Sequence, residues 1–184
     1  YAEEGEAAFY GPKADFMAQD ALGREWQLST IQVDFIQPAR LGCEYIGEDG
    51  QPHTPVLLHR AVTGTTERFL GVLIEHYAGN FPVWLAPVQA TVIPVAEMNM
   101  EYATQVLHEL EAAGVRADLY SRNEKIGAKI RDAEQSKVPY MLVVGKRDAE
   151  NGTVSVRRHG GEDLGAMPRA DFLNKVVAEG RAAL

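Results

Sequence analysis

Alternation of polar and apolar residues dominates the first part of the chain. Residues 14–18 and 25–35 alternate with a period of two, and residues 20–24 between them contain the glycine of a tight turn. This pattern predicts two antiparallel strands. We expect Gln27 and Ser29 on the same face of the second strand, because side chains two positions apart share a face.

A hairpin turn, a strand and a helix are predicted to follow. Asp49-Gly50 is typical of a hairpin turn, and an extended segment covers residues 54–58. The next predicted element is a helix over about 67–77. Its run Phe69–Ile74 is so apolar that we expect the helix to be largely buried.

From residue 87 onwards, strand and helix patterns alternate along the chain. Strands are predicted at 90–95, 115–120, 138–145 and 154–158, and helices at 98–113, 125–135 and 172–183. This order predicts an α/β sandwich with a mostly parallel sheet. The prolines of Phe81–Pro87 interrupt regular structure, so we place the boundary between two domains, 1–86 and 87–184, at this segment.

Composition and charge narrow the class of protein. The chain has 184 residues and 46% hydrophobic residues, which is enough for two small domains. No apolar run reaches the roughly 18 residues of a membrane span, and the single Cys43 excludes an internal disulfide. We therefore expect a soluble cytoplasmic protein with no membrane partner.

Charge is distributed unevenly along the chain. The net charge is −8 overall and −7 within residues 1–86, whereas residues 116–158 carry a net charge of +4. Such an asymmetry is typical of a surface that faces nucleic acid, although solvated helix faces with scattered lysines give the same count.

The segment from His59 to Phe69 contains the first candidates for chemistry. His59 is either a metal ligand or a structural histidine, because one histidine alone never makes a zinc site. Arg68 opens an apolar helix, where its planar fork suits a phosphate or carboxylate, or pairs with Glu67. Gly64 before it supplies a flexible turn with free backbone N–H groups. These residues predict one wall of an anion-binding site.

Several segments resemble a known family. Residues 59–69 resemble motif 3 of the class II aminoacyl-tRNA synthetases. Together with 9–13 and 26–35, they are similar to the threonyl-tRNA synthetase family. Residues 122–127 and 138–145 resemble the anticodon-binding domain that several class II synthetases share. The resemblance implies an α/β (α+β) chain: part of an antiparallel catalytic core, followed by a mostly parallel anticodon-binding domain.

The resemblance also assigns roles in the catalytic part. It implies that Arg68 and Lys13 are catalytic and that His59 is one of three ligands of a zinc ion, whereas Cys43 matches no ligand position. It implies ATP, with Mg²⁺, and threonine as ligands of Tyr10, Gln27, Thr30, Gln32, Thr65 and Arg68. The family's strand commonly reads Gln-Cys-Gly-Thr where this chain has Gln27-Leu28-Ser29-Thr30, which keeps the two polar positions. Tyr10 and Lys13 by themselves are also compatible with a generic turn.

In the second domain, the resemblance implies that Asn123, Asp148 and Arg157 contact anticodon bases. Side chains of these types can pair with base edges. Asp148 stands where the family often has a longer glutamate. Asn123 alone is also compatible with the N-cap of the predicted helix 125–135.

The expected enzyme activates threonine with ATP and transfers it to tRNA(Thr), as a homodimer in its full-length form. The chain has no initiator Met and no motif 1 or motif 2, so we expect these residues to be the C-terminal part of such a ligase and to be inactive alone. Two alternatives are open: a non-catalytic RNA-binding module, and another class II synthetase such as the prolyl enzyme. The His59-Arg60-Ala61 sequence favours the threonyl enzyme.

Overall fold

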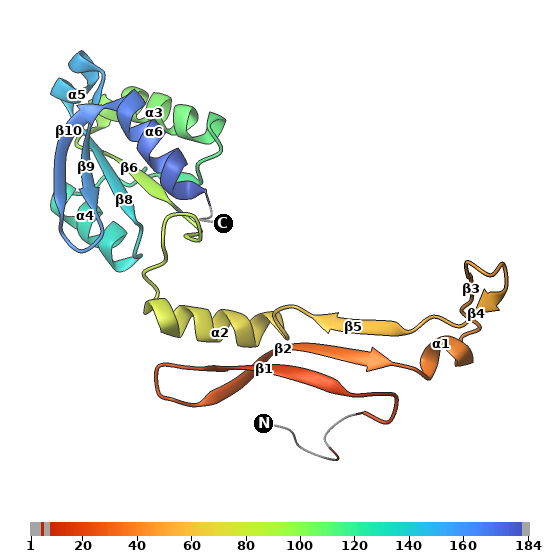
Figure 1. Cartoon of the computed structure of the whole chain (residues 1–184). Helices are drawn as coiled ribbons and strands as arrows, with labels where there is room; N and C mark the ends of the chain where they lie inside the picture. The colour runs from red at the N-terminus through yellow and green to blue at the C-terminus, as the bar shows by residue number, and fades with distance from the viewer. Residues whose placement is uncertain (1–4, 6–7, 182–184) are drawn as a thin grey trace. The chain divides into compact units, whose positions relative to one another are not determined.

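The computed structural model describes Gly5 and residues 8–181 of the chain (Figure 1). The chain folds into two compact units, Tyr1–His76 and Tyr77–Leu184. No helix in the described part of the chain is long and apolar enough to cross a membrane.

Unit 1 is built on a three-stranded antiparallel sheet with the order β1-β2-β5. Its elements are β1 (Lys13–Gln19), β2 (Glu25–Asp34), α1 (Gln37–Arg40), β3 (Tyr45–Ile46), β4 (Pro52–His53), β5 (Leu57–Ala61) and α2 (Thr66–Tyr77). The two predicted long strands and the hairpin turn are present. The third strand begins three residues later than predicted and includes His59.

A β-bulge changes which side chains of β2 share a face. Met17 pairs with Gln27 and Phe16 pairs with Ser29, so Leu28 is the extra residue of β2. A bulge of this kind reverses the alternation of faces beyond it. Gln27 therefore shares a face with Thr30, and our prediction that it lies beside Ser29 is wrong.

Helix α2 is much less buried than its sequence predicted. None of its residues is buried, and Leu70 and Ile74 are 47% and 45% exposed. The prediction of a largely buried helix is wrong, because apolar residues occur on several sides of this helix and a single three-stranded sheet covers only one of them. Among the described residues, the buried hydrophobic side chains all belong to unit 2.

Unit 2 contains a five-stranded sheet with the order β10-β9-β8-β6-β7. Its elements are β6 (Ala90–Pro94), a 3-10 turn (Glu97–Asn99), α3 (Met100–Ala112), β7 (Ala117–Leu119), α4 (Ile126–Gln135), β8 (Tyr140–Val144), α5 (Lys146–Asn151), β9 (Thr153–Arg158), β10 (Asp163–Pro168) and α6 (Arg169–Gly180). Strand β6 is parallel to β7 and β8, whereas β9 is antiparallel to both of its neighbours. The mixed α/β class is as predicted; α5 and β10 were not predicted.

Helices cover both faces of this sheet. Residues of α3 and α6 pack with Leu142 and Val156 on one face, where the rings of Tyr140 and Phe172 are 5.3 Å apart. Ala133 of α4 packs with Ile93 and Met141 on the other face. Figure 1 shows α3 and α6 side by side across the sheet from α4. The hydrophobic core of unit 2 thus lies on both sides of its central strands.

The proline-rich segment 81–87 packs within unit 2. The Arg116 guanidinium donates hydrogen bonds to the carbonyl oxygens of Trp84 and Ala86, and the Gln89 side chain donates to Val83. Because these hydrogen bonds hold the segment to the second sheet, the observed division falls at 76/77, ten residues before the position that the prolines suggested.

Candidate functional site

A row of polar side chains crosses the sheet of unit 1. Lys13, Gln32 and His59 are cross-strand neighbours on β1, β2 and β5, so their side chains project from the same face. The Tyr10 hydroxyl donates a hydrogen bond of 3.1 Å to Gln32 Oε1, and the Tyr10 ring lies 5.6 Å from the His59 ring. Four of the predicted site residues are therefore brought together on this face.

A second group adjoins this row around Asp15. The Asp15 carboxylate lies 2.9 Å from Lys13 Nζ and accepts a 2.6 Å hydrogen bond from the Gln27 amide. Hydrogen bonds from Lys13 and then Thr30 lower the pKa of Asp15 below its usual value. The bulge at Leu28 makes this group possible, because it turns Gln27 towards the same face as Thr30. With Tyr10, Gln32 and His59, these residues form what we call the polar face.

His59 is held by a buried carboxylate that the sequence analysis missed. Its Nε2 lies 2.8 Å from Oδ2 of Asp34, whose side chain is 0% exposed. Burial opposes ionisation of Asp34, but the hydrogen bonds from His59 and from the backbone of Gln37 and Ile36 keep the pKa of its carboxyl below the usual value. An ionised carboxylate only accepts hydrogen bonds, so Nε2 is the donor in this contact, and in the neutral form of the ring Nδ1 carries the lone pair.

A histidine held by a carboxylate in this way is common among metal ligands. A metal-ligating histidine commonly donates its second ring N–H to a carboxylate, which fixes the orientation of the ring. Among the described residues, no three histidine, cysteine, aspartate or glutamate side chains come together as a ligand set. His59 thus fits the role of one ligand, and the chain as described does not supply a whole site.

Arg68 lies beside the Gln27 end of the polar face. It is in the first turn of α2, and its Nη1 donates a 3.0 Å hydrogen bond to the Gln27 carbonyl. The Thr65 carbonyl accepts a hydrogen bond from Phe69 N where the helix begins. Gly64 has a φ of +67°, and a Cβ there would lie 2.5 Å from the Leu28 carbonyl oxygen. Only glycine therefore lets the loop come this close to β2.

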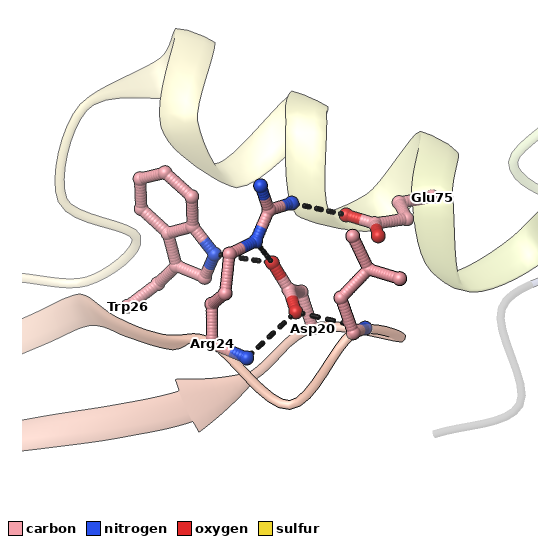
Figure 2. A network of polar contacts seen from close by, with 5 residues as sticks. Asp20, Arg24, Trp26 and Glu75 are labelled. Atoms are coloured by element: carbon pink, nitrogen blue, oxygen red, sulfur yellow. Dashed lines mark hydrogen bonds and ion pairs between the residues drawn. The ribbon is translucent and has the colours of Figure 1, made fainter.

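A buried carboxylate also organises the turn between β1 and β2. Both oxygens of Asp20 accept hydrogen bonds: Oδ1 from the backbone of Leu22 and Arg24, and Oδ2 from the Arg24 guanidinium and from the Trp26 indole (Figure 2). Burial raises the pKa of Asp20, but the Trp26 and Arg24 hydrogen bonds outweigh it and lower the pKa to about 2.

Replacing Asp20 with Asn should make the chain less stable at neutral pH. Because the folded pKa is about 2 and the ordinary value is 3.8, the ionised Asp20 stabilises the fold above pH 3.8. That contribution is lost as the pH falls from 3.8 towards 2. Thermal unfolding followed by circular dichroism between pH 7 and pH 2 should show a melting temperature several degrees lower for the variant at pH 7, with the two curves converging at acid pH. The exposed Glu25, replaced with Gln, is the control; a constant difference at all pH values would contradict the prediction.

In unit 2, Asp148 is engaged within its own domain. It is 9% exposed, and its carboxylate accepts hydrogen bonds from Gly145 N and from the hydroxyls of Thr153 and Ser155 at 3.0 to 3.2 Å. Thr153, Ser155 and Arg157 alternate with the buried Val154 and Val156 along β9. Asp148 therefore binds side chains on the same face of β9 as Arg157.

Arg157 and Asn123 lie on the side of the sheet that α4 covers. Arg157 pairs with Met141, which packs against α4, and the exposed Asn123 lies in the loop before that helix. The helix begins at Ile126 with Lys125 as its N-cap, so Asn123 does not have the capping role. Nη1 of Arg157 lies 3.2 Å from Asp163, and its buried Nε has no hydrogen-bond partner among the described residues.

Two family profiles match the two units. The tRNA synthetase class II core domain (G, H, P, S and T) matches residues 3–77, and the anticodon binding domain matches residues 89–179. The threonine–tRNA ligase of Rubrobacter xylanophilus is 64% identical over 176 residues, which are 95% of this chain and 28% of the relative. That of Thermus thermophilus is 58% identical over 179 residues, 97% of this chain and 27% of the relative. The chain belongs to the threonyl-tRNA synthetase family.

Solved structures agree with this assignment. The structure titled as the RNA binding domain of threonyl-tRNA synthetase from Cryptosporidium parvum superimposes with a TM-score of 0.88 at 35% identity, over 96% of this chain and 45% of that one. A prolyl-tRNA synthetase from the same organism has a TM-score of 0.68 at 24% identity, over 97% of this chain and 43% of that one, which shows a shared fold alone. The chain spans little more than a quarter of the length of the threonyl relatives it matches.

The structure of this threonyl-tRNA synthetase family member shows three acidic residues near the candidate site that the sequence analysis did not select as site residues. They are Asp15, Asp20 and Asp34, each of which holds a candidate residue or its neighbour by hydrogen bonds. Asp34 and Asp15 had a usable signal: each follows a candidate residue, Gln32 or Lys13, at a spacing of two and so belongs to the same face of its strand. The contact of Asp15 with Gln27 and the contacts of Asp20 depend on a bulge and a turn, for which the sequence shows no period.

Proposed function

We propose that this chain is the C-terminal part of a threonine–tRNA ligase, which joins threonine to ATP as the adenylate and transfers it to tRNA(Thr). The observation that carries the proposal is the row Lys13–Gln32–His59, with His59 oriented by the buried Asp34. The chain that contains this row is 64% identical, over 95% of the chain's own length, to a threonine–tRNA ligase. The homodimer expected from the sequence remains part of the proposal.

Within such a ligase, Arg68 binds the phosphates of ATP, which carries Mg²⁺. Its guanidinium is exposed, and Gln27 O occupies one N–H, so the other side of the fork is free to pair with phosphate oxygens. Adenylation is a displacement at the α-phosphate, in which positioning and charge stabilisation supply most of the catalysis. Lys13 adds a second cation on the polar face, where Asp15 fixes its position.

The other side chains of the polar face orient the ligands without adding charge. Tyr10 and Gln32 are already hydrogen-bonded to one another, so the amide is held with its N–H groups available to a substrate. Gln27 and Thr30 are fixed in the same way by Asp15. Thr65 lies in the loop before Arg68 and supplies a hydroxyl beside the phosphate site.

His59 would contribute one zinc ligand through Nδ1, because Asp34 occupies Nε2. The remaining ligands would come from residues of the ligase outside this chain. A zinc ion with an open position can bind the amino group and the hydroxyl of threonine, which separates threonine from the nearly isosteric valine. The role of this chain is to present the His59 nitrogen in one orientation.

Unit 2 would bind the anticodon of tRNA(Thr). Asn123 and Arg157 lie on the α4 side of the sheet, and Asp148 orders β9 next to Arg157. These three residues lie within the segment 116–158, whose net charge of +4 would favour contacts with phosphates.

The amino-acid specificity can be measured with the complete ligase that contains these residues. We expect ATP–pyrophosphate exchange that depends on threonine and not on proline, followed by charging of tRNA(Thr). Exchange with proline would favour the prolyl alternative. Binding of tRNA without any amino-acid-dependent exchange would favour a non-catalytic RNA-binding protein.

Replacing Arg157 with Ala in this chain should weaken tRNA(Thr) binding by about 1–3 kcal/mol and reduce its preference for the cognate anticodon. The reason is that an arginine on a base edge contributes specificity, whereas a phosphate contact weakens all tRNAs alike. Titrations with tRNA(Thr) and an anticodon-swapped version at several salt concentrations measure both effects. Arg158, whose guanidinium lies over the Tyr140 ring on the opposite face, is the matched control. Equal affinity of the wild-type chain for both tRNAs would contradict a base-reading role.

A further inference from the structure

Arg68 lies next to an aromatic ring as well as a carbonyl group. Its guanidinium carbon is 5.9 Å from the centre of the Trp26 ring, and Nη1 donates to Gln27 O. Among the described residues, it forms no ion pair within 4.0 Å, although Glu67 precedes it and Glu75 lies on the same helix. Its positive charge is thus held in place by neutral groups and stays available to an anion.

Trp26 is itself fixed from the other side. The indole Nε1 donates a 2.9 Å hydrogen bond to Asp20, whose side chain is fully buried (Figure 2). The same carboxylate binds the Arg24 guanidinium, which lies 5.7 Å from the centre of the Trp26 ring. The indole N–H edge of Trp26 is therefore held by Asp20, and the guanidinium groups of Arg24 and Arg68 both lie near its ring.

Two carboxylates near Arg68, those of Asp20 and Glu75, are paired with Arg24. Figure 2 shows Arg24 between Asp20 and Glu75, and its Nη2 lies 3.5 Å from Glu75. Because Arg24 takes up both acids, neither neutralises Arg68. A hollow of about 390 Å³ remains beside them, lined by Trp26, Glu67, Arg68 and Gly71 among others. The Arg24–Glu75 pair thus ties the turn to α2, while the guanidinium of Arg68 faces an open hollow.

We propose that Trp26 and Asp20 are positioning residues for Arg68: Trp26 sets the plane of the guanidinium that binds a nucleotide phosphate, and Asp20 sets Trp26. This proposal rests on the proposed ATP-binding role of Arg68. An arginine side chain has many rotamers, and a bidentate contact with phosphate uses only a few of them. A cation held over an indole face loses most of that freedom before the nucleotide arrives. Arg24 acts in the same unit by keeping Glu75 away from Arg68.

A network that only stabilises the turn would predict a different result. In that case, loss of the indole would lower the stability of the fold. Its effect on kcat and on KM for ATP of the folded protein would then be the same whether Arg68 is present or replaced. If Trp26 acts through Arg68, its effect on ATP must disappear when Arg68 is already absent. A double-mutant cycle separates the two cases.

The experiment uses the complete ligase and measures KM for ATP, KM for threonine and kcat in ATP–pyrophosphate exchange. The variants are Trp26→Leu, Trp26→Phe, Asp20→Asn, Arg68→Ala and Trp26→Leu combined with Arg68→Ala. The Trp26→Leu variant loses one cation–π contact, so its KM for ATP should rise by about 3- to 30-fold. Trp26→Phe keeps a ring but loses the hydrogen bond to Asp20. Asp20→Asn keeps the ring but replaces the charged acceptor of the indole N–H and of Arg24 with a neutral amide. Both variants should therefore raise KM for ATP less than Trp26→Leu does. KM for threonine should change less than twofold in all three.

Phe16→Leu is the matched control, because it removes the ring next to the guanidinium of Arg60, 5.6 Å away on the same sheet. It should leave KM for ATP unchanged. Circular dichroism at the assay temperature shows that each variant is folded, and Trp26→Phe and Asp20→Asn carry the test if Trp26→Leu is not. Equal effects of Trp26→Leu with and without Arg68 would overturn the positioning role while leaving the function intact. No effect of Arg68→Ala on KM for ATP would instead overturn the proposed function of Arg68.

Discussion

Replacing His59 with alanine in the complete ligase is expected to remove most of the bound zinc and most of the discrimination of threonine against valine. A site that bonds directly to a substrate hydroxyl can reject the analogue without it by about 10⁴-fold, whereas shape alone distinguishes the two by about 10²-fold or less. Loss of one of three protein ligands should therefore reduce the discrimination towards the lower value. Metal analysis, together with exchange kinetics for threonine and valine, measures both effects.

Two further variants show whether the effect belongs to this site. Asp34→Asn should weaken zinc binding by about 10- to 100-fold, because it loosens the ring that Asp34 orients. His53→Ala is the matched control, since His53 also lies 2.9 Å from an aspartate, Asp49, but in the separate β3–β4 hairpin. Zinc content that is unchanged in the His59 variant would show that His59 is only structural.

Replacing Arg68 with alanine should reduce kcat/KM for ATP in the exchange reaction by about 10²- to 10³-fold. Removal of one preorganised group that stabilises transition-state charge has an effect of that size. Arg68→Lys should recover only part of the activity, because lysine keeps the charge but lacks the planar fork that bonds two phosphate oxygens. Steady-state kinetics with ATP as the varied substrate measure the loss.

Arg60 provides the control for this second prediction. It is also an exposed arginine of unit 1, but it donates to the Ser29 hydroxyl and the Thr30 backbone carbonyl and lies over Phe16 on the opposite face of the sheet. Arg60→Ala should therefore leave kcat/KM for ATP within a few-fold of the wild type. A similar loss in both variants would indicate a general effect of positive charge and contradict a specific role of Arg68.

Much of the secondary structure follows from local patterns. The alternation in residues 25–35 predicted β2, and the turn at Asp49-Gly50 predicted the β3–β4 hairpin, because these signals depend on neighbouring residues. The short helix α5 and the strand β10 were missed. Strand β10 has a glycine and a bulge near its start, and five of its six residues pair with β9 in a hairpin. Its regularity comes from that pairing more than from its own sequence.

Burial was predicted less well than helix or strand type. The apolar run in α2 correctly indicated a helix, yet Leu70 and Ile74 stay nearly half exposed in this chain. An apolar side chain shows that burial would be favourable, but burial also needs a surface to pack against. The sheet of unit 1 offers one such surface, whereas the helices of unit 2 have a complete core.

By itself, the sequence determined the chemical types of the site: a histidine, an arginine and a lysine among amides and hydroxyls, in motifs similar to one family. Only the tertiary structure decided which of them meet. The bulge at Leu28 brings Gln27 to the face of Thr30, and the pairing of β2 with β5 places Asp34 against His59. The second contact joins residues 25 positions apart, and the first depends on one extra residue in a strand. Periodicity places Asp34 on the face of Gln32, but it does not predict either contact, because both are set by the register between strands.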